Sequence, residues 1–163
     1  MSDLDELLLL QEEVFAVLER PDLLRRNTVE MLAGCLAEPH HSLGAFAGGR
    51  LAGVGILYDP LGVPEEDLSH LAADAARGMR CGNFKLCMVR PDFRGHGLQQ
   101  LLGLRLEEEA RRKGMEALCA TVAPMNGASR HSLERLGYRQ AAVVEKYGFE
   151  RLVFVKRLVV DLV

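Results

Sequence analysis

The 163-residue chain has 48% hydrophobic residues, 26% charged residues and a formal net charge of −3 at pH 7. This composition is typical of one globular domain over residues 1–163, and the small acidic excess argues against a dedicated nucleic-acid-binding protein. No apolar stretch reaches the roughly 18 residues that cross a bilayer, and the first residues are acidic where a secretory signal is basic. We therefore expect a cytoplasmic protein that acts away from membranes.

Two helices are expected at the start of the chain. Apolar residues recur at helical spacing over residues 4–18, and Pro21 ends that run. Thr28 is a suitable N-cap for a second helix that extends to about Leu36.

A strand hairpin and an insertion follow. Strands over residues 43–47 and 51–58 are joined through Gly48-Gly49, which is a two-residue hairpin signal. Residues 59–82 break the strand pattern, and Pro64 with three acids after it predicts the start of a helix. The apolar face of that helix would consist of Leu68, Leu71, Ala72 and Ala75.

The second half of the chain predicts alternating strands and helices. Strands are expected over residues 84–89, 117–122, 140–146 and 151–160, and helices over residues 98–112 and 126–136. This order predicts a mixed α/β sheet with helices on its faces.

The four cysteines predict neither a metal site nor disulfides. They form no C-x-x-C pair and have no histidine at zinc-finger spacing, so no structural metal is expected. A chain without an export signal stays where thiols are reduced. Cys87 and Cys119 lie inside apolar runs and are predicted to be small buried side chains rather than nucleophiles.

The segment from Arg94 to Gln99 (RGHGLQ) lies between a predicted strand and a predicted helix. Its two glycines permit a tight turn, and the first N–H groups of the helix would point to one side of it. Such a turn is an anion site suited to a phosphate or pyrophosphate, or else an ordinary strand-to-helix connection. Neither a Walker loop nor a dinucleotide fingerprint fits these residues.

The segment 89–98, VRPDFRGHGL, resembles the acyl-CoA-binding motif of the GNAT superfamily of N-acetyltransferases. Asn126-Gly127-Ala128-Ser129 and Leu136-Gly137-Tyr138 stand where that family has an Asn-led helix and a Leu-Gly-aromatic turn. The other predicted elements also match, so the resemblance covers essentially the whole chain. It implies a mixed, mostly antiparallel sheet flanked by helices. The strands at 84–89 and 117–122, the family's fourth and fifth, would splay apart to admit acyl-CoA.

The resemblance also implies a reaction and a set of contacts. Acetyl-CoA would be the acyl donor, and an amine of the acceptor would attack its thioester directly in a ternary complex. A backbone N–H near Val89 would polarise the thioester carbonyl. Asn126 would bind the pantetheine arm, serve as a simple helix N-cap, or do both. The residues implied in cofactor binding are Met88, Val89, Arg94, Gly95, His96, Gly97, Leu98, Gln99, Asn126 and Ser129.

The chain departs from the family pattern where protons are transferred. Many members have a Tyr at the position of Leu133 and an acid on the strand that here carries Lys85. Ser132, Tyr147 and Glu145 are the candidate catalytic residues that remain. These departures leave open a second hypothesis, a non-catalytic acyl-CoA-binding or regulatory module.

The acceptor and the oligomeric state are open at this point. The acceptor amine belongs to a small molecule or to a peptide or protein. The acidic residues at 65–67 would suit a cationic amine, or they form a solvated helix start. The valine-rich final strand pairs across a homodimer or lies within the sheet; its valines are Val153, Val155, Val159 and Val160.

Overall fold

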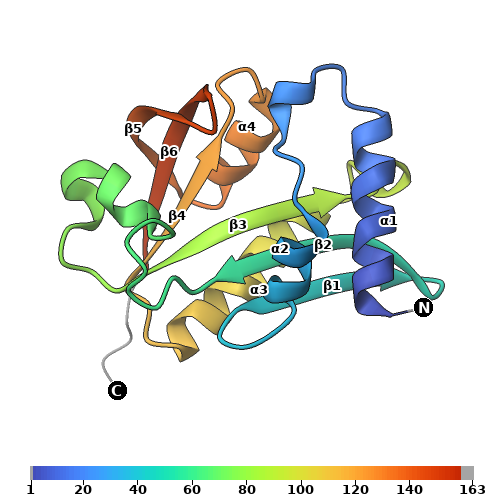
Figure 1. The fold of residues 1–163 in the computed structure, drawn as a ribbon, viewed down its shortest axis with the longest axis horizontal. Helices are drawn as coiled ribbons and strands as arrows, with labels where there is room; N and C mark the ends of the chain where they lie inside the picture. Colours follow the sequence, from blue (N-terminus) through green and yellow to red (C-terminus); the bar gives the residue numbers. More distant parts are fainter. Residues whose placement is uncertain (1, 159–163) are drawn as a thin grey trace.

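In residues 2–158, which the computed structural model describes, six strands form one sheet and four α-helices cover its two faces (Figure 1). The strands are β1 (His41–Ala47), β2 (Arg50–Tyr58), β3 (Cys81–Val89), β4 (Ala117–Val122), β5 (Arg139–Lys146) and β6 (Phe149–Arg157). The α-helices are α1 (Asp3–Ala16), α2 (Val29–Cys35), α3 (Leu98–Arg112) and α4 (Gly127–Arg135). The spatial order is β1-β2-β3-β4-β6-β5.

The sheet opens between its two central strands. All neighbouring strands are antiparallel except β3 and β4, which are parallel. These two share register pairs only from Cys81↔Ala117 to Asn83↔Cys119, although β3 continues to Val89 and β4 to Val122. The predicted fold class, including the splayed pair of strands, is therefore confirmed.

Local capping chemistry sets the helix boundaries. The Thr28 hydroxyl accepts a hydrogen bond from the Met31 N–H at 3.2 Å, and the Asn126 side-chain oxygen accepts one from the Ser129 N–H at 3.1 Å. Gly137 follows α4 with φ of 91°, a conformation that favours glycine. The predicted starts of α2 and α4 are thus confirmed.

The insertion between β2 and β3 differs from the prediction. In place of one helix from Pro64 it has two 3₁₀ helices, Leu68–Leu71 and Ala73–Ala76. Ala73 lies at φ 51°, which interrupts a continuous α-helix. The buried Asn83 amide also competes with helical hydrogen bonding, since it contacts the main chain of Glu66 and Leu68.

The expected apolar face of the insertion does pack against the body. Leu68 and Ala72 are buried in a cluster that includes side chains of β4 and β6. The insertion therefore covers the end of the sheet where β3 and β4 are still paired. Its partly buried members are Leu71 and Ala75.

The two sheet faces have separate cores. α1 and α2 pack on one face of β2 and β3, while α3 packs on the other. α3 approaches closely because β2 carries a glycine under it: a Cβ on Gly55 would lie 2.8 Å from Leu106 Cδ1. No helix within residues 2–158 combines the length and apolar character needed to span a bilayer.

β6 lies inside the sheet, with β4 on one edge and β5 on the other. Val153 and Val155 are buried there and have register partners on both neighbouring strands. The valine-rich strand is predicted either to pair across a homodimer or to lie within the sheet, and at these two valines it lies within the sheet. Val159 and Val160 lie outside the described residues.

Candidate active site

Two adjoining cavities occupy the opening between β3 and β4. The outer cavity, about 570 Å³, lies beside the start of α3, the end of β3 and the start of α4. The inner cavity, about 120 Å³, lies between β3 and β4 below the segment that joins α1 to α2. The cavities share six lining residues, which are Leu23, Leu24, Cys87, Gln99, Asn126 and Ser129. They therefore form one continuous cleft.

The turn before α3 presents a row of free backbone donors to the outer cavity. Gly95 and Gly97 have φ of 79° and 75°, and Gly97 starts the helix without a side-chain cap. No hydrogen-bond acceptor in the described chain takes the N–H groups of residues 95–100. A Cβ on either glycine would project into open space. This is the geometry of an anion site at the positive end of a helix dipole.

The edge of β3 that faces the cleft offers further peptide groups. The Arg90 N–H donates to Ala52 O at 2.8 Å, so the main-chain N–H and C=O groups of Arg90 point toward β2. Hydrogen-bonding direction alternates along an antiparallel strand, so the main-chain groups of Met88 also point toward β2. The N–H and C=O groups of Val89 and Cys87 point the other way, toward β4. Beyond Asn83 these groups have no strand partner on that edge. An extended ligand arm is able to pair with them as an added strand would.

Nine of the ten predicted cofactor-binding residues line the outer cavity. They are Met88, Val89, Arg94, Gly95, Gly97, Leu98, Gln99, Asn126 and Ser129. The exception is His96, whose ring Nδ1 turns back to Arg94 O at 2.9 Å and does not border the cavity. The Asn126 side chain is engaged by the protein, as the cap of α4 and as a donor to Leu23 O at 3.3 Å.

The three candidate catalytic residues lie in different places. Ser132 borders the outer cavity, and its Oγ accepts a hydrogen bond from Gln100 Nε2 at 2.8 Å. Tyr147 borders the inner cavity from the β5–β6 turn. Glu145 is exposed and lines neither cavity. Leu133, at the position where many GNAT proteins have a Tyr, borders the inner cavity.

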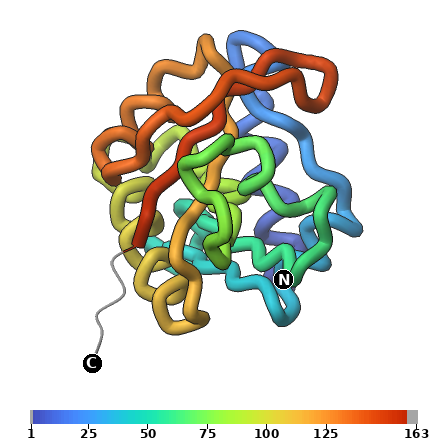
Figure 2. The backbone as a smooth tube through the Cα atoms, turned by 90° about the vertical axis from the view of Figure 1, so that its left-hand side faces the viewer, coloured from blue at the N-terminus to red at the C-terminus, as the bar shows by residue number. Residues whose placement is uncertain are grey.

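The segment 17–28, between α1 and α2, contributes lining residues to both cavities. Its backbone crosses from the end of α1 toward α4 and then returns to α2 (Figures 1 and 2). Two hydrogen bonds attach it to the other side of the cleft: Asn126 Nδ2 donates to Leu23 O, and Arg151 Nη1 donates to Asp22 O at 3.0 Å. Gln11 of α1 fastens its other end, because its amide exchanges 3.0 Å hydrogen bonds with the main chain of Asn27.

Three cationic side chains line the inner cavity, and the sequence patterns had singled out only one of them. Lys85 stands where many GNAT proteins have an acid, while the sequence patterns do not single out Arg25 or Arg151. Arg151 directly precedes four apolar residues of β6, a position at which a charged residue is unusual, and that is the available signal. The acids at 65–67 line neither cavity.

The prediction that Cys87 is a small buried side chain rather than a nucleophile is corrected in its first part only. Cys87 is half-buried and borders both cavities, whereas Cys119 is fully buried as predicted. Its apolar surroundings raise the pKa of the Cys87 thiol to about 12, which keeps it protonated and poorly nucleophilic at neutral pH. Nowhere in residues 2–158 do three His, Cys, Asp or Glu side chains gather as metal ligands.

Solved structures share this fold. The ribosomal-protein-S18-alanine N-acetyltransferase from Escherichia coli aligns with a TM-score of 0.69 and 16% identity over 99% of this chain and 92% of its own. The protein yncA from Salmonella typhimurium, provisionally assigned as an acetyltransferase and solved with its cofactor acetyl-CoA, gives 0.68 and 22% over 99% and 92%. The ribosomal-protein-alanine N-acetyltransferase from Brucella melitensis gives 0.69 and 19% over 97% of both chains.

Sequence comparison agrees with the fold. The family model described as FR47-like protein matches residues 60–147, more than half of the chain, and this range contains the turn before α3 and the whole of α4. No curated protein matches the chain. The chain therefore belongs to the FR47-like family and, through it and its fold, to the GNAT superfamily.

Proposed function

We propose that the protein is an acyl-CoA-dependent N-acetyltransferase that transfers the acetyl group of acetyl-CoA to an amine of a small molecule or peptide. The observation that carries the proposal is the row of acceptor-free N–H groups at residues 95–100, beside a cleft that leads into the open sheet. Family membership and a neighbour solved with acetyl-CoA support the same donor.

The residues of the outer cavity suit the nucleotide end of that donor. The pyrophosphate would accept hydrogen bonds from the backbone of residues 95–100, where the αL glycines leave room for it. Arg94 and Arg135 border the same cavity and add positive charge. The pantetheine arm would lie along the free edge of β3, with the peptide groups of Val89 and Cys87 as partners.

The transfer itself needs positioning more than side-chain chemistry. The neutral amine nitrogen forms a C–N bond to the acetyl carbon as the C–S bond breaks; its proton passes to a base or to water, and CoA leaves as a thiolate that is then protonated. We place the thioester near Cys87, where the two cavities meet, with a free N–H on the β3 edge to stabilise the developing oxyanion. Tyr147 and Ser132 are the proton donors we propose, with water as the third.

Binding and turnover test this function separately. A thermal scan with CoA should show stabilisation, about 2.7 kcal/mol when CoA is 100 times its Kd, while NAD should have much less effect. A panel of amines with acetyl-CoA should release free CoA and give the N-acetyl product by mass spectrometry. A protein that is not stabilised by millimolar CoA would contradict the proposal.

The second candidate, a non-catalytic acyl-CoA-binding module, is favoured by one observation. Leu133 borders the inner cavity where many members have a Tyr and cannot donate a proton. This candidate predicts stabilisation by CoA together with no turnover across the whole amine panel.

A further inference from the structure

The inner cavity has a strong charge preference. Arg25, Lys85 and Arg151 line it, from the segment before α2, from β3 and from β6. Among its lining residues, all within the described part of the chain, there is no aspartate or glutamate. This charge is opposite to that of the acids in the insertion, so the cavity is suited to an anion rather than to a polyamine.

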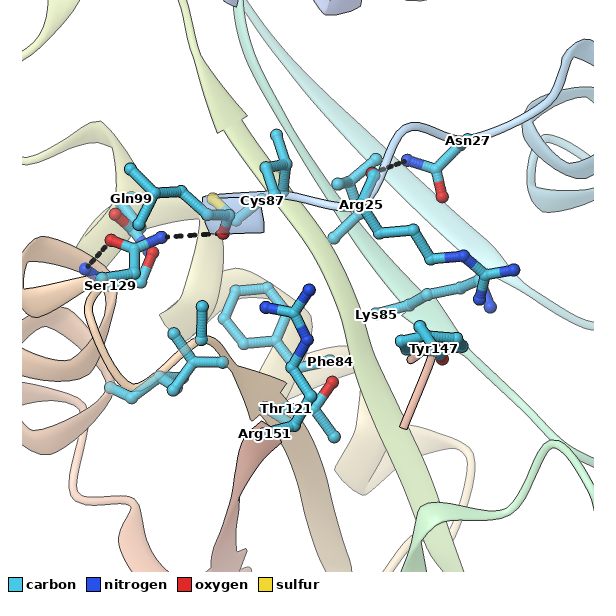
Figure 3. A pocket seen from close by; sticks show the side chains of 18 of the residues that line it. Arg25, Asn27, Phe84, Lys85, Cys87, Gln99, Thr121, Ser129, Tyr147 and Arg151 are labelled. Carbon is cyan, nitrogen blue, oxygen red and sulfur yellow. Dashed lines mark hydrogen bonds between the residues drawn. The ribbon is translucent and has the colours of Figure 1, made fainter. Parts of the chain in front are cut away.

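Arg151 is the most informative of the three cations. It is 5% exposed, and the hydrogen bond from its Nη1 goes to an uncharged main-chain oxygen, that of Asp22. It forms no ion pair with any carboxylate in residues 2–158. Figure 3 shows its guanidinium extending from β6 into the cavity. The Asp22 carboxylate forms its direct ion pair with Arg20, which lowers its pKa, and Arg151 lies close enough to add to this lowering. A bound anion would give the buried Arg151 a direct charged partner of its own.

The other two cations are held by aromatic rings. The Arg25 guanidinium lies 3.9 Å from the ring centroid of Tyr147, and Lys85 Nζ lies 4.4 Å from that of Tyr58 (Figure 3 labels Arg25, Tyr147 and Lys85). A ring face orients a cation without neutralising it. Lys85 Nζ also forms a long ion pair with the exposed Glu66 carboxylate, at 3.8 Å. Arg25 has no carboxylate partner among the described residues, so its charge is the more available of the two to a ligand in the cavity.

We propose that the acceptor is a small amine that also carries an oxyanion, a carboxylate or a phosphate, and that Arg151, Arg25 and Lys85 bind this oxyanion. The inference rests on the proposed function and names its acceptor class. The planar guanidinium fork matches both kinds of oxyanion through paired hydrogen bonds. A volume of about 120 Å³ suits a molecule of amino-acid size.

Matched pairs of amines test the proposal. Alanine is compared with ethylamine, and phosphoethanolamine with ethanolamine, by kcat/KM at saturating acetyl-CoA. We expect the anionic member of at least one pair to exceed its neutral-chain partner by roughly tenfold or more. The pair that responds distinguishes carboxylate from phosphate. Equal rates within both pairs, or faster acetylation of putrescine, would overturn the inference while leaving the proposed function intact.

Neighbouring arginines supply a matched variant and control. Arg25→Ala should raise KM for the preferred anionic amine roughly tenfold and leave KM for acetyl-CoA within twofold. Arg26→Ala removes an exposed arginine that pairs with Glu12 and lines neither cavity, so it should change neither constant. If Arg25→Ala raises KM for the anionic and the neutral amine alike, the side chain does not bind the oxyanion and the inference fails.

A binding measurement gives a readout independent of turnover. With CoA saturating, the N-acetyl product of the preferred amine should raise the melting temperature further in the parent protein and in Arg26→Ala, but not in Arg25→Ala. Arg151→Gln should lose this increment, and Arg151→Lys, which keeps the charge, should retain part of it. Because Arg151 also fastens Asp22, the stabilisation by CoA alone is the check that each variant is folded. An unchanged increment in folded Arg25→Ala and Arg151→Gln would also overturn the inference.

Discussion

Asn83 and Cys119 form the last register pair between β3 and β4, and the side chain of Asn83 is turned toward the insertion. Its oxygen accepts from the Leu68 N–H at 3.4 Å, and its Nδ2 donates to Glu66 O. One buried amide therefore lies where the sheet opens and where the insertion is anchored. The position of the cleft and the packing of the insertion are linked through it.

The first prediction concerns this anchor. Asn83→Ala leaves the N–H of buried Leu68 and the C=O of Glu66 without these partners, so unfolding free energy should fall by about 1–3 kcal/mol. Urea denaturation measures the loss. Ser42→Ala removes a comparable side-chain-to-main-chain hydrogen bond, from Ser42 of β1 to Cys35 O of α2 at 2.8 Å. Because it lies at the β1 edge of the sheet, away from the insertion, it shows whether the change in exchange is confined to the insertion. Only Asn83→Ala should increase amide exchange in residues 66–76.

A second prediction concerns the proposed phosphate site. Gly97→Val should abolish stabilisation by CoA, since a branched side chain would enter the space in front of the free N–H groups. Gly114→Val is matched to it, because Gly114 has φ of 72° against 75° and also faces open space, but it lies at the far end of α3. Both variants should lose similar intrinsic stability, and only Gly114→Val should still respond to CoA. Equal CoA responses would place the phosphates elsewhere.

A third prediction separates direct transfer from a covalent route. With its pKa raised to about 12, the Cys87 thiol is a thiolate in roughly one molecule in ten thousand at pH 8. Cys87→Ala should therefore keep kcat within a few-fold, and intact-protein mass spectrometry with acetyl-CoA should show no acetylated enzyme. A stable acetyl adduct that disappears in Cys87→Ala would contradict direct attack by the amine.

The fourth prediction concerns proton transfer. Because Leu133 stands at the usual Tyr position, no single side chain should dominate, and Ser132→Ala and Tyr147→Phe should each lower kcat by about 10²-fold or less. Single-turnover rates at saturating acetyl-CoA are the measurement. Ser129→Ala, which removes a hydroxyl that also borders the cleft, is the comparison. A loss near 10⁴-fold in one variant, with CoA binding intact, would identify a dedicated acid.

Local sequence signals predicted much of this fold because each turn or helix cap that they indicate is determined by the conformation of only a few neighbouring residues. The Asn126 cap, the Gly48-Gly49 turn and the glycines of the 95–97 turn all depend on short-range backbone geometry, and the structure has them as predicted. The resemblance to a family added the order of the elements and the splayed strands, which periodicity alone does not give.

The parts that failed depend on contacts between distant segments. The helix predicted from Pro64 competes with hydrogen bonds from Asn83, which follows it by almost twenty residues. Arg25 and Arg151 meet in one cavity although they are far apart in sequence, and no local pattern links them. The catalytic role of Glu145 stays a prediction: the residue is chosen for its chemistry, and the structure leaves it exposed and lining neither cavity.

The course of segment 17–28 bears on the order in which the acyl donor and the acceptor enter the cleft. It leaves α1 on the β2–β3 half of the sheet, is fastened to α4 and β6 on the other half, and returns to α2 (Figure 1). The two halves of the sheet are therefore connected at two places: by the β3–β4 pairing, which ends at Asn83, and by segment 17–28, which crosses over the cleft. The cleft is enclosed by chain on both of these sides. Under the proposed function a long donor enters the cleft lengthwise from the outer cavity and the acceptor from the inner one. Neither substrate has to withdraw before the other can arrive.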